Sequence, residues 1–258
     1  MRYHVGRVDD PIPSQTPAAL PILEDPSPAG RLMNAAALAT ALLLAAVLGA
    51  RLATQLPGVG WWVPAALVAG MAAADLLSGI VHWAADTWGR DDLPVIGRRL
   101  LVPFRVHHIN PDDFLRRRFV DVNGDVARLA VPAFLGLLLV PLDTSAGRVV
   151  AAFGLAFCGT GMMTNQIHQW AHRPKPPRPV RLLQACGVLL DGPTHAAHHA
   201  GPYDTHYCIT TGWWNRPLET LGFFRALERL ITMATGAQPR RDDRRYETRY
   251  GAARLSPR

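Results

Sequence analysis

Charge, cysteine and nucleotide-binding motifs are all scarce in this sequence. Only 18% of its 258 residues are charged while 49% are hydrophobic, and this balance favours a membrane domain over a soluble one. The three cysteines are an odd number, so we expect no disulfide framework. No G-x-G-x-x-G motif follows a strand-like run, which argues against a nicotinamide or flavin bound by this chain.

The net charge of +7 raises the question of an acidic partner. The arginines flank apolar segments and do not form a basic stripe interleaved with aromatic residues, which is the pattern that reads bases. We therefore expect no nucleic-acid partner. Anionic phospholipid is predicted to balance the positive charge.

The apolar residues are concentrated in four blocks, which cover residues 32–50, 52–74, 129–142 and 149–171. A membrane-spanning helix needs about 20 apolar residues, so three blocks are long enough and block 129–142 is short. Bilayer thinning and a snorkelling Arg128 would cover the shortfall. The predicted fold is all-α, a polytopic membrane bundle of about four transmembrane helices.

The two ends of the chain differ from its apolar middle. Residues 1–30 are rich in proline and acid and are predicted to form a disordered leader, with no removable secretory signal before the first block. Residues 236–258 are predicted to form a solvated basic tail. Residues 31–235 then remain as one membrane-embedded domain.

The placement of the arginines predicts which side each loop faces. Cytoplasmic loops retain Lys and Arg, while exported loops are depleted of them. The two loops predicted to be exported hold only Arg51 and Arg148, whereas the long loop predicted at 90–128 is rich in arginine. We therefore expect both termini in the cytoplasm. The Ala-, Arg- and Pro-rich composition suggests a bacterial inner membrane.

All but one of the ten histidines lie in or beside four short motifs. The motifs are His82-Trp83-Ala84-Ala85-Asp86, His107-His108, Asn165-Gln166-Ile167-His168-Gln169-Trp170-Ala171-His172 and His195-Ala196-Ala197-His198-His199. On a helix, a spacing of four residues places His82 beside Asp86 and His168 beside His172. Asp75 continues the first of these faces deeper into the membrane, where a carboxylate is costly and suggests a function.

Each motif alone also has an ordinary explanation, such as an interfacial tryptophan with polar neighbours or a satisfied pair of histidines. The predicted topology weakens these explanations, because it places all four motifs on the same side of the membrane. The sequence therefore predicts a cytoplasmic, histidine-rich metal-binding cap on the bundle.

Eight histidines with aspartates nearby exceed what one four-coordinate zinc ion can use, which indicates two metal ions. Iron with open coordination positions activates oxygen, and a site at the mouth of a lipid-embedded bundle meets unactivated alkyl C–H bonds. We therefore predict an oxygen-dependent lipid oxidation. A haem protein with His168 or His172 as axial ligand, and a zinc-binding hydrolase or structural module, stay open as alternatives.

Several of these motifs resemble the plasmanylethanolamine desaturase family, also called Kua or CarF-type lipid desaturases. The similarity extends over about residues 70–245. It is carried by the runs Gly79 to Gly89, Pro103 to His108, Asn123 to Asp125, Thr164 to His168 and His198 to Trp213.

The resemblance implies a lipid desaturase domain that introduces the vinyl-ether double bond into 1-O-alkyl glycerophospholipids, converting plasmanylethanolamine to plasmenylethanolamine in plasmalogen biosynthesis. It implies two non-haem iron ions, O2 as co-substrate and a membrane ether phospholipid as substrate. An external electron donor of the cytochrome or ferredoxin type would supply the electrons. The alternative within the family is an acyl-chain desaturase of a phospholipid with the same di-iron site.

The resemblance also implies which residues bind metal. The implied ligands are His82, Asp86, His107, His108, His168, His172, His195, His198 and His199, with Asp86 as a ligand or as support for one. Weaker candidates for hydrogen-bonding support of the ligands are Asp75, Asn165 and His206.

Two positions depart from the family pattern. Arg117-Arg118 precedes Phe119 where the family usually has a His-Asp pair, and Thr194 stands where it often has a histidine. Guanidinium forks bind phosphate, so the arginines at 116–118 are candidates for holding a lipid headgroup. A solvated loop face is the other interpretation.

Overall fold

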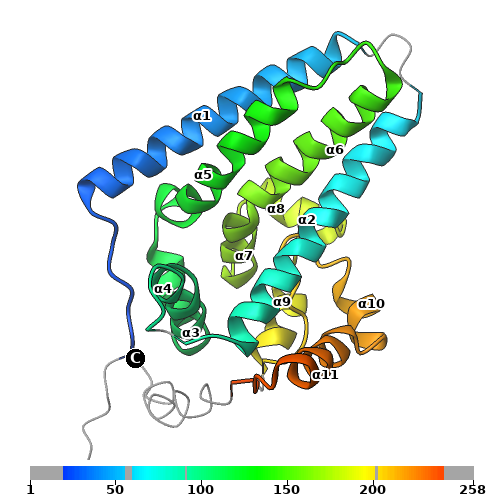
Figure 1. Ribbon diagram of the computed structural model, residues 1–258. Helices are drawn as coiled ribbons and strands as arrows, with labels where there is room; N and C mark the ends of the chain where they lie inside the picture. The colour runs from blue at the N-terminus through cyan, green and yellow to red at the C-terminus, as the bar shows by residue number, and fades with distance from the viewer. Residues whose placement is uncertain (1–19, 56–59, 91, 201–202, 241–258) are drawn as a thin grey trace, which may run out of the picture.

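The computed structural model describes most of the chain, namely residues 20–55, 60–90, 92–200 and 203–240. Within these ranges all regular secondary structure is helical, which confirms the predicted all-α class. Long helices form an elongated bundle, and most of the shorter helices gather at one end of it (Figure 1).

Four long helices make up the bundle. They are α1 (Pro28–Ala53), α2 (Trp62–Thr87), α5 (Phe119–Leu138) and α6 (Ser145–Met162). The helices pack in the order α1, α5, α6, α2, so that neighbours in space are not always neighbours in sequence (Figure 1).

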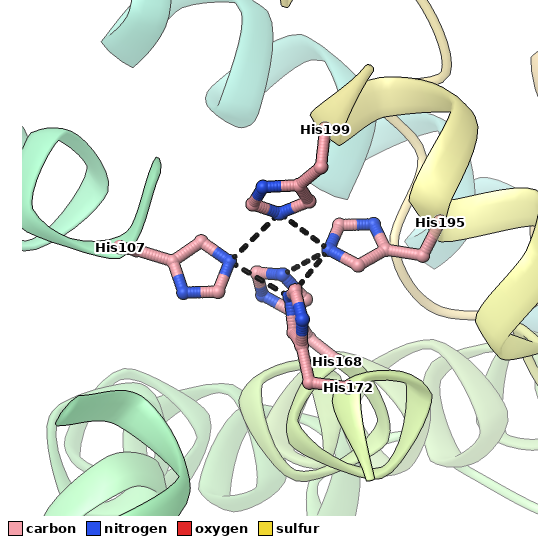
Figure 2. Close-up of side chains that lie close together, drawn as sticks. All are labelled: His107, His168, His172, His195 and His199. Carbon is pink, nitrogen blue, oxygen red and sulfur yellow. Dashed lines mark hydrogen bonds between the residues drawn. The ribbon is translucent and has the colours of Figure 1, made fainter. Parts of the chain in front are cut away.

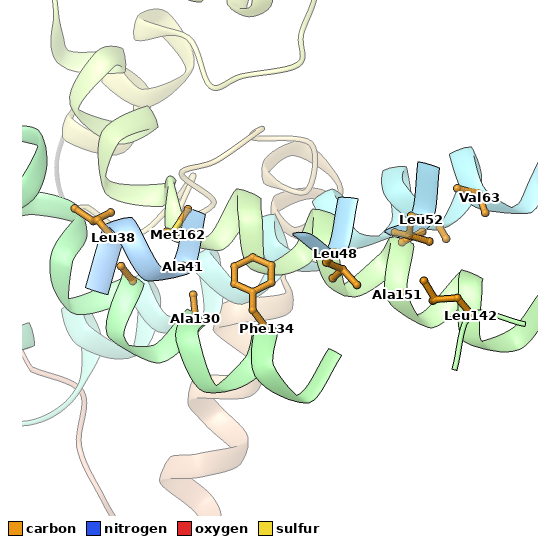
Figure 3. Packing of buried hydrophobic residues seen from close by; sticks show 13 residues of the cluster. Leu38, Ala41, Leu48, Leu52, Val63, Ala130, Phe134, Leu142, Ala151 and Met162 are labelled. Atoms are coloured by element: carbon orange, nitrogen blue, oxygen red, sulfur yellow. The ribbon is translucent and has the colours of Figure 1, made fainter. Parts of the chain in front are cut away.

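Apolar side chains fill the space between these helices (Figure 3). Phe134 of α5 and Leu48 of α1 are fully buried in this cluster. Small residues let the backbones approach closely, as in other helical membrane bundles. A Cβ atom on Gly70 of α2 would lie 2.3 Å from the Phe153 carbonyl oxygen of α6, so this contact requires glycine.

Three of the long helices, α1, α2 and α6, are long and apolar enough to cross a membrane. Together they indicate a membrane protein. The fourth, α5, contains residues 129–138 of the short apolar block, but its first half also carries Asp121, Asp125 and Arg128. The expected number of four crossings and the cytoplasmic side of the histidines stay predictions.

Two helix boundaries differ from the apolar blocks. The second long helix covers Trp62–Thr87 and not 52–74, because the polar residues after Ala74 continue the helix. The block 149–171 is divided at Met163 into α6 and a short α7 (Thr164–His172). Uncharged stretches therefore locate these helices but do not give their ends.

The arginine-rich stretch 90–128, predicted to be a loop, is largely helical. It contains a π-helix (Gly97–Leu101), α3 (Val102–Ile109), α4 (Pro111–Arg116) and the first turns of α5. Pro111 separates α3 from α4, since proline has no N–H to continue a helix but fits a first turn. The short helices give the histidines of this region fixed directions.

The described residues of the C-terminal part, 173–200 and 203–240, form four more helices. They are α8 (Arg178–Ala185), α9 (Gly192–His199), α10 (Asn215–Thr220) and α11 (Phe223–Thr235). The last three lie near the C-terminal end of α2 (Figure 1).

The segment predicted to be a disordered leader is described only in part. Residues 1–19 lie outside the described residues, and residues 20–27 run along α4. There the Arg116 guanidinium donates to the Leu23 carbonyl oxygen at 2.7 Å. The first helix then begins at Pro28, inside the predicted leader.

Candidate metal centre

All nine predicted ligand side chains lie together in two adjacent groups. The five-histidine group consists of His107, His168, His172, His195 and His199. The aspartate group consists of His82, Asp86, His108 and His198. Within each group, one ligand atom from each residue lies within 4.8 Å of all the others. Because α3 and α9 each carry two adjacent histidines, each of these helices contributes to both groups.

The five-histidine group presents the same atom from every ring (Figure 2). The Nε2 atom of His195 lies 2.7 Å from Nε2 of His168 and 2.7 Å from Nε2 of His172. The Nε2 atom of His107 lies 2.9 Å from that of His172 and 3.2 Å from that of His199. The rings come from α3, α7 and α9, so three separate helices define this group.

The aspartate group combines three imidazoles with one carboxylate. The Oδ2 atom of Asp86 lies 3.2 Å from Nε2 of His82, its neighbour one turn earlier on α2. The same oxygen lies 3.7 Å from Nε2 of His108 and 3.7 Å from Nε2 of His198. All four residues are buried.

This clustering fits bound metal ions better than hydrogen bonding alone. A neutral imidazole has one N–H, so five Nε2 atoms converging on one point cannot all be satisfied by each other. Nitrogens bound at about 2.1 Å to one ion and at right angles lie about 3.0 Å apart, close to the spacings found here. In the aspartate group, the fully buried Nε2 of His82 lies 3.2 Å from the Asp86 carboxylate but forms no hydrogen bond with the described residues.

Burial favours the neutral form of the imidazoles, which is the form that binds metal. It lowers the pKa of His172 and of His198 from 6.5 to about 4. Burial, followed by repulsion from neighbouring histidines, lowers the pKa of His107, His108 and His195 well below 6.5. Imidazole and carboxylate donors suit iron, zinc and copper alike.

Backbone carbonyls fix the tautomer of two rings in the aspartate group. Nδ1 of His82 lies 3.0 Å from the Tyr207 carbonyl oxygen, and Nδ1 of His198 lies 2.7 Å from the Thr205 carbonyl oxygen. A carbonyl accepts only from a protonated nitrogen, so the proton stays on Nδ1 and the Nε2 lone pair faces the group.

Asp75 lies on the same face of α2 but outside both groups. Its Oδ1 atom accepts hydrogen bonds from the backbone N–H groups of Thr210, Thr211 and Gly212, at 2.9–3.2 Å. Its Oδ2 atom accepts from the Trp214 N–H at 3.2 Å. The buried carboxylate therefore anchors the segment after Tyr207 to α2, and supports the ligands only through that segment.

The other two supporting candidates also lie outside the groups. The Asn165 amide donates to the Val122 carbonyl oxygen of α5 at 2.6 Å, which ties the start of α7 to the bundle. Nδ1 of His206 lies 2.7 Å from the Thr205 hydroxyl. Neither residue directly contacts a ligand atom through an interaction found among the described residues.

A second anchor of α7 was not predicted from the sequence. The Gln169 amide donates to the carbonyl oxygens of Phe114 and Arg117, at 2.8 and 3.1 Å. Together with Asn165, it ties α7 to α5 and to the end of α4, and so fixes the directions in which His168 and His172 point. The position of Gln169 next to the predicted ligand His168 could have indicated a supporting role. Its partners, however, are more than 50 residues away in the sequence.

Aromatic rings that enclose the centre were also missed. The Tyr203 ring stacks on His108, with ring centroids 4.4 Å apart. The Phe114 ring lies 5.1 Å from His107 and 5.1 Å from His168. These rings restrict the orientation of the imidazoles and exclude water from their faces.

Thr194 and Arg117, which stand where the family pattern usually has histidines, contact groups of the chain outside the two ligand groups. The Thr194 N–H is bound at 2.8 Å by the carboxylate of Asp191, which caps α9. Arg117 donates to the Glu24 carbonyl oxygen at 2.6 Å. Both residues lie outside the two groups, and the groups assemble without them. Because the Arg117 guanidinium already donates to a carbonyl group of the same chain, this contact does not favour the interpretation that Arg117 binds the phosphate of a lipid headgroup.

The start of the predicted basic tail reaches the centre from outside. The Arg240 guanidinium donates to the Asp86 carbonyl oxygen at 2.6 Å. The backbone N–H of Arg240 donates to the Thr87 carbonyl oxygen at 2.8 Å. A cation at the C-terminal end of α2 is favourable for the helix dipole. Residues 241–258, the rest of that tail, lie outside the described residues.

The fold and the site thus define the class: an all-helical membrane protein with two adjacent groups of histidine and aspartate side chains that could hold metal ions. Comparison with known proteins gives the family: the lipid desaturase domain matches residues 71–242. The chain belongs to this family, and it is an oxidoreductase of the lipid desaturase type.

Two similar proteins are named plasmanylethanolamine desaturases. The one from Myxococcus xanthus is 41% identical over 84% of this chain and 77% of its own length. The mouse protein, plasmanylethanolamine desaturase 1, is 42% identical over 70% of this chain and 69% of its own length.

A more distant relative carries a different name. The chloroplastic fatty acid desaturase 4 of Arabidopsis thaliana is 37% identical over 67% of this chain and 52% of its own length. No solved structure shows a significant match to this chain. The comparisons therefore give the family and the class of reaction.

Proposed function

We propose that this protein is an O2-dependent di-iron desaturase that introduces the vinyl-ether double bond into 1-O-alkyl glycerophospholipids. The observation that carries the proposal is the pair of adjacent ligand groups, nine donors in all, in a chain similar to two plasmanylethanolamine desaturases. One iron would be held by the five-histidine group and the other by the aspartate group. Bound iron would supply the oxidation of unactivated alkyl C–H bonds by O2.

The described residues prepare the site for this chemistry. The carbonyl groups of Tyr207 and Thr205 keep the Nε2 atoms of His82 and His198 free of protons. Asp86 adds a negative charge that offsets part of the positive charge brought by the metal. The stacked ring of Tyr203 and the buried ring of Tyr207 limit the entry of water.

The balance of the reaction requires partners. Removing two hydrogens from neighbouring carbons while reducing O2 to two waters consumes two further electrons and two protons. We propose that an external carrier of the cytochrome or ferredoxin type delivers these electrons. The proposed substrate is a membrane ether phospholipid, and the proposed location is a bacterial inner membrane with the metal centre and both termini on the cytoplasmic side.

Lipid analysis of cells that lack their own ether-lipid desaturase tests the proposal. Cells supplied with a 1-O-alkyl phospholipid and expressing this chain are expected to yield lipids that release fatty aldehyde in mild acid, as vinyl ethers do. Cells expressing His168→Ala should release none. Equal aldehyde from both would exclude His168 from the reaction, and no aldehyde from either would overturn the proposed substrate.

The same cells separate the remaining candidates. An acyl-chain desaturase, suggested by the name of the Arabidopsis relative, would give a new double bond in acyl chains and no aldehyde. Metal analysis of the purified protein should find two irons per chain and no haem absorption band. Stoichiometric zinc without oxygen consumption would instead favour the hydrolase or structural alternative.

A further inference from the structure

Helix α11 (Phe223–Thr235) carries an apolar stripe that no described residue covers. Leu230 is 57% exposed and Met233 is 77% exposed. Phe223 and Ala226 extend the stripe at helical spacing, and both are exposed. Exposed apolar residues that recur every three to four positions form a continuous face on a helix, unlike scattered surface leucines.

The opposite side of α11 is attached to the wall of the metal centre. The Phe224 ring stacks on Trp83 of α2 with centroids 5.6 Å apart, and it lies 5.0 Å from the Tyr207 ring. Trp83 follows the proposed ligand His82, and Tyr207 provides the carbonyl group that holds it. The position of α11 is therefore fixed by the residues that support the aspartate group.

The depth of Trp83 in the membrane can be estimated from the length of α2. A helix of 26 residues is about 39 Å long, while the hydrocarbon core is about 30 Å thick. The last turns of α2, which include Trp83, are therefore expected near the headgroups. A helix packed on Trp83 lies at the same level (Figure 1).

Charge complementarity identifies the surface that α11 meets. Arg225 and Arg229 are exposed beside the stripe, one turn apart. Glu228 is partly buried on the attached side, and Glu219 pairs with Arg225 at 3.0 Å. An apolar face bordered by arginines is the composition of helices that lie in the surface of an anionic membrane.

We propose that α11 lies in the plane of the membrane surface, with its exposed stripe among the acyl chains and its arginines among anionic headgroups. The partner is the phospholipid bilayer that contains α1, α2 and α6. This contact attaches the end of the protein that carries the two ligand groups to the lipid surface. The attachment is made by α11, which packs on Trp83 and Tyr207 beside His82. It does not depend on which lipid is oxidised.

Site-directed spin labelling of the full chain in nanodiscs of phosphatidylethanolamine and phosphatidylglycerol tests this placement. Cys186, the exposed native cysteine, is first replaced by serine. One nitroxide is then placed at Met233→Cys, in the stripe, and a matched one at Arg225→Cys, on the polar side of the same helix. Leu230→Cys serves as a second stripe position, and unchanged metal content shows that each variant is folded.

The stripe labels are expected to collide with dissolved oxygen at least about fivefold more often, relative to a water-soluble nickel complex, than the Arg225→Cys label. Oxygen concentrates in acyl chains and the nickel complex in water. Equal ratios at all three positions would overturn the proposal, because the stripe would then face water. Protection of the stripe from both reagents would also overturn it, since a protein partner or a second copy of the chain would then cover this face.

Discussion

The two ligand groups share two helices but differ in charge and burial. The five-histidine group contains no carboxylate, and its His172 and His199 are partly exposed. The aspartate group contains Asp86 and is buried throughout. Backbone carbonyls orient two of its three imidazoles. A negative ligand in a water-free place offsets more of a cation's charge, so the aspartate group is expected to hold its ion more tightly.

The largest effect is expected from Asp86→Asn, which removes the only carboxylate in either group. We predict that the variant retains about one iron per chain, in the five-histidine group, and loses desaturase activity by at least about a hundredfold. Metal analysis after purification, together with the aldehyde assay, measures both. Asp92→Asn, at an exposed carboxylate outside the groups, is the control. Two irons in Asp86→Asn would show that Asp86 is not a ligand.

Asp75→Asn tests the other aspartate on the same face of α2. The amide places donors against backbone N–H groups, so we expect a loss of about 2–4 kcal/mol of folding stability. The measurement is thermal unfolding in nanodiscs, with iron content determined at low temperature. Both irons should remain bound there. Loss of iron without loss of stability would instead give Asp75 a direct role at the metal.

His172→Ala and His198→Ala compare the exposed and buried edges of the centre. Loss of His172 leaves four imidazoles in its group, and we expect about a tenfold weaker affinity for one ion. Because His172 is partly exposed, added imidazole should restore iron binding and activity. The buried position of His198 should not respond to imidazole. Rescue of both variants, or of neither, would contradict the assigned difference in access.

The smallest effect is expected from Arg240→Ala. The guanidinium donates to the carbonyl group of Asp86, so iron in the aspartate group should dissociate about threefold to tenfold faster in a chelator. Arg240→Lys retains the charge and should give an intermediate rate. If Arg240→Ala released iron faster only from the five-histidine group, the prediction would be wrong.

Much of the centre was predictable from the sequence because its ligands lie in short motifs. The spacing of four between His82 and Asp86, and between His168 and His172, fixes their common faces on any helix. The motifs also carry the resemblance to the desaturase family, which the domain match at residues 71–242 confirms. The roles of the nine residues as ligands stay predictions, although the structure places them together.

The features that the sequence does not reveal depend on contacts that are distant in the sequence. The partners of Asp75 are the Thr210 hydroxyl and backbone N–H groups from Thr210 to Trp214, so its supporting role depends on a segment far along the chain. The stretch 90–128 looked like a loop because it is rich in arginine, yet it forms short helices. Two of its arginines, Arg116 and Arg117, donate to groups of the segment 23–25, which no local pattern reveals.

The sequence by itself determined the helical class, the apolar bundle and the side chains proposed as metal donors, because periodicity and residue chemistry are local properties. Only the tertiary structure decided how nine donors divide into two unequal groups. That division depends on which way α3 and α9 face, since adjacent histidines on a helix point in different directions. The Thr205 carbonyl oxygen, 2.7 Å from Nδ1 of His198 on α9, and the Tyr203 ring, which stacks on His108 of α3, hold these histidines in their directions.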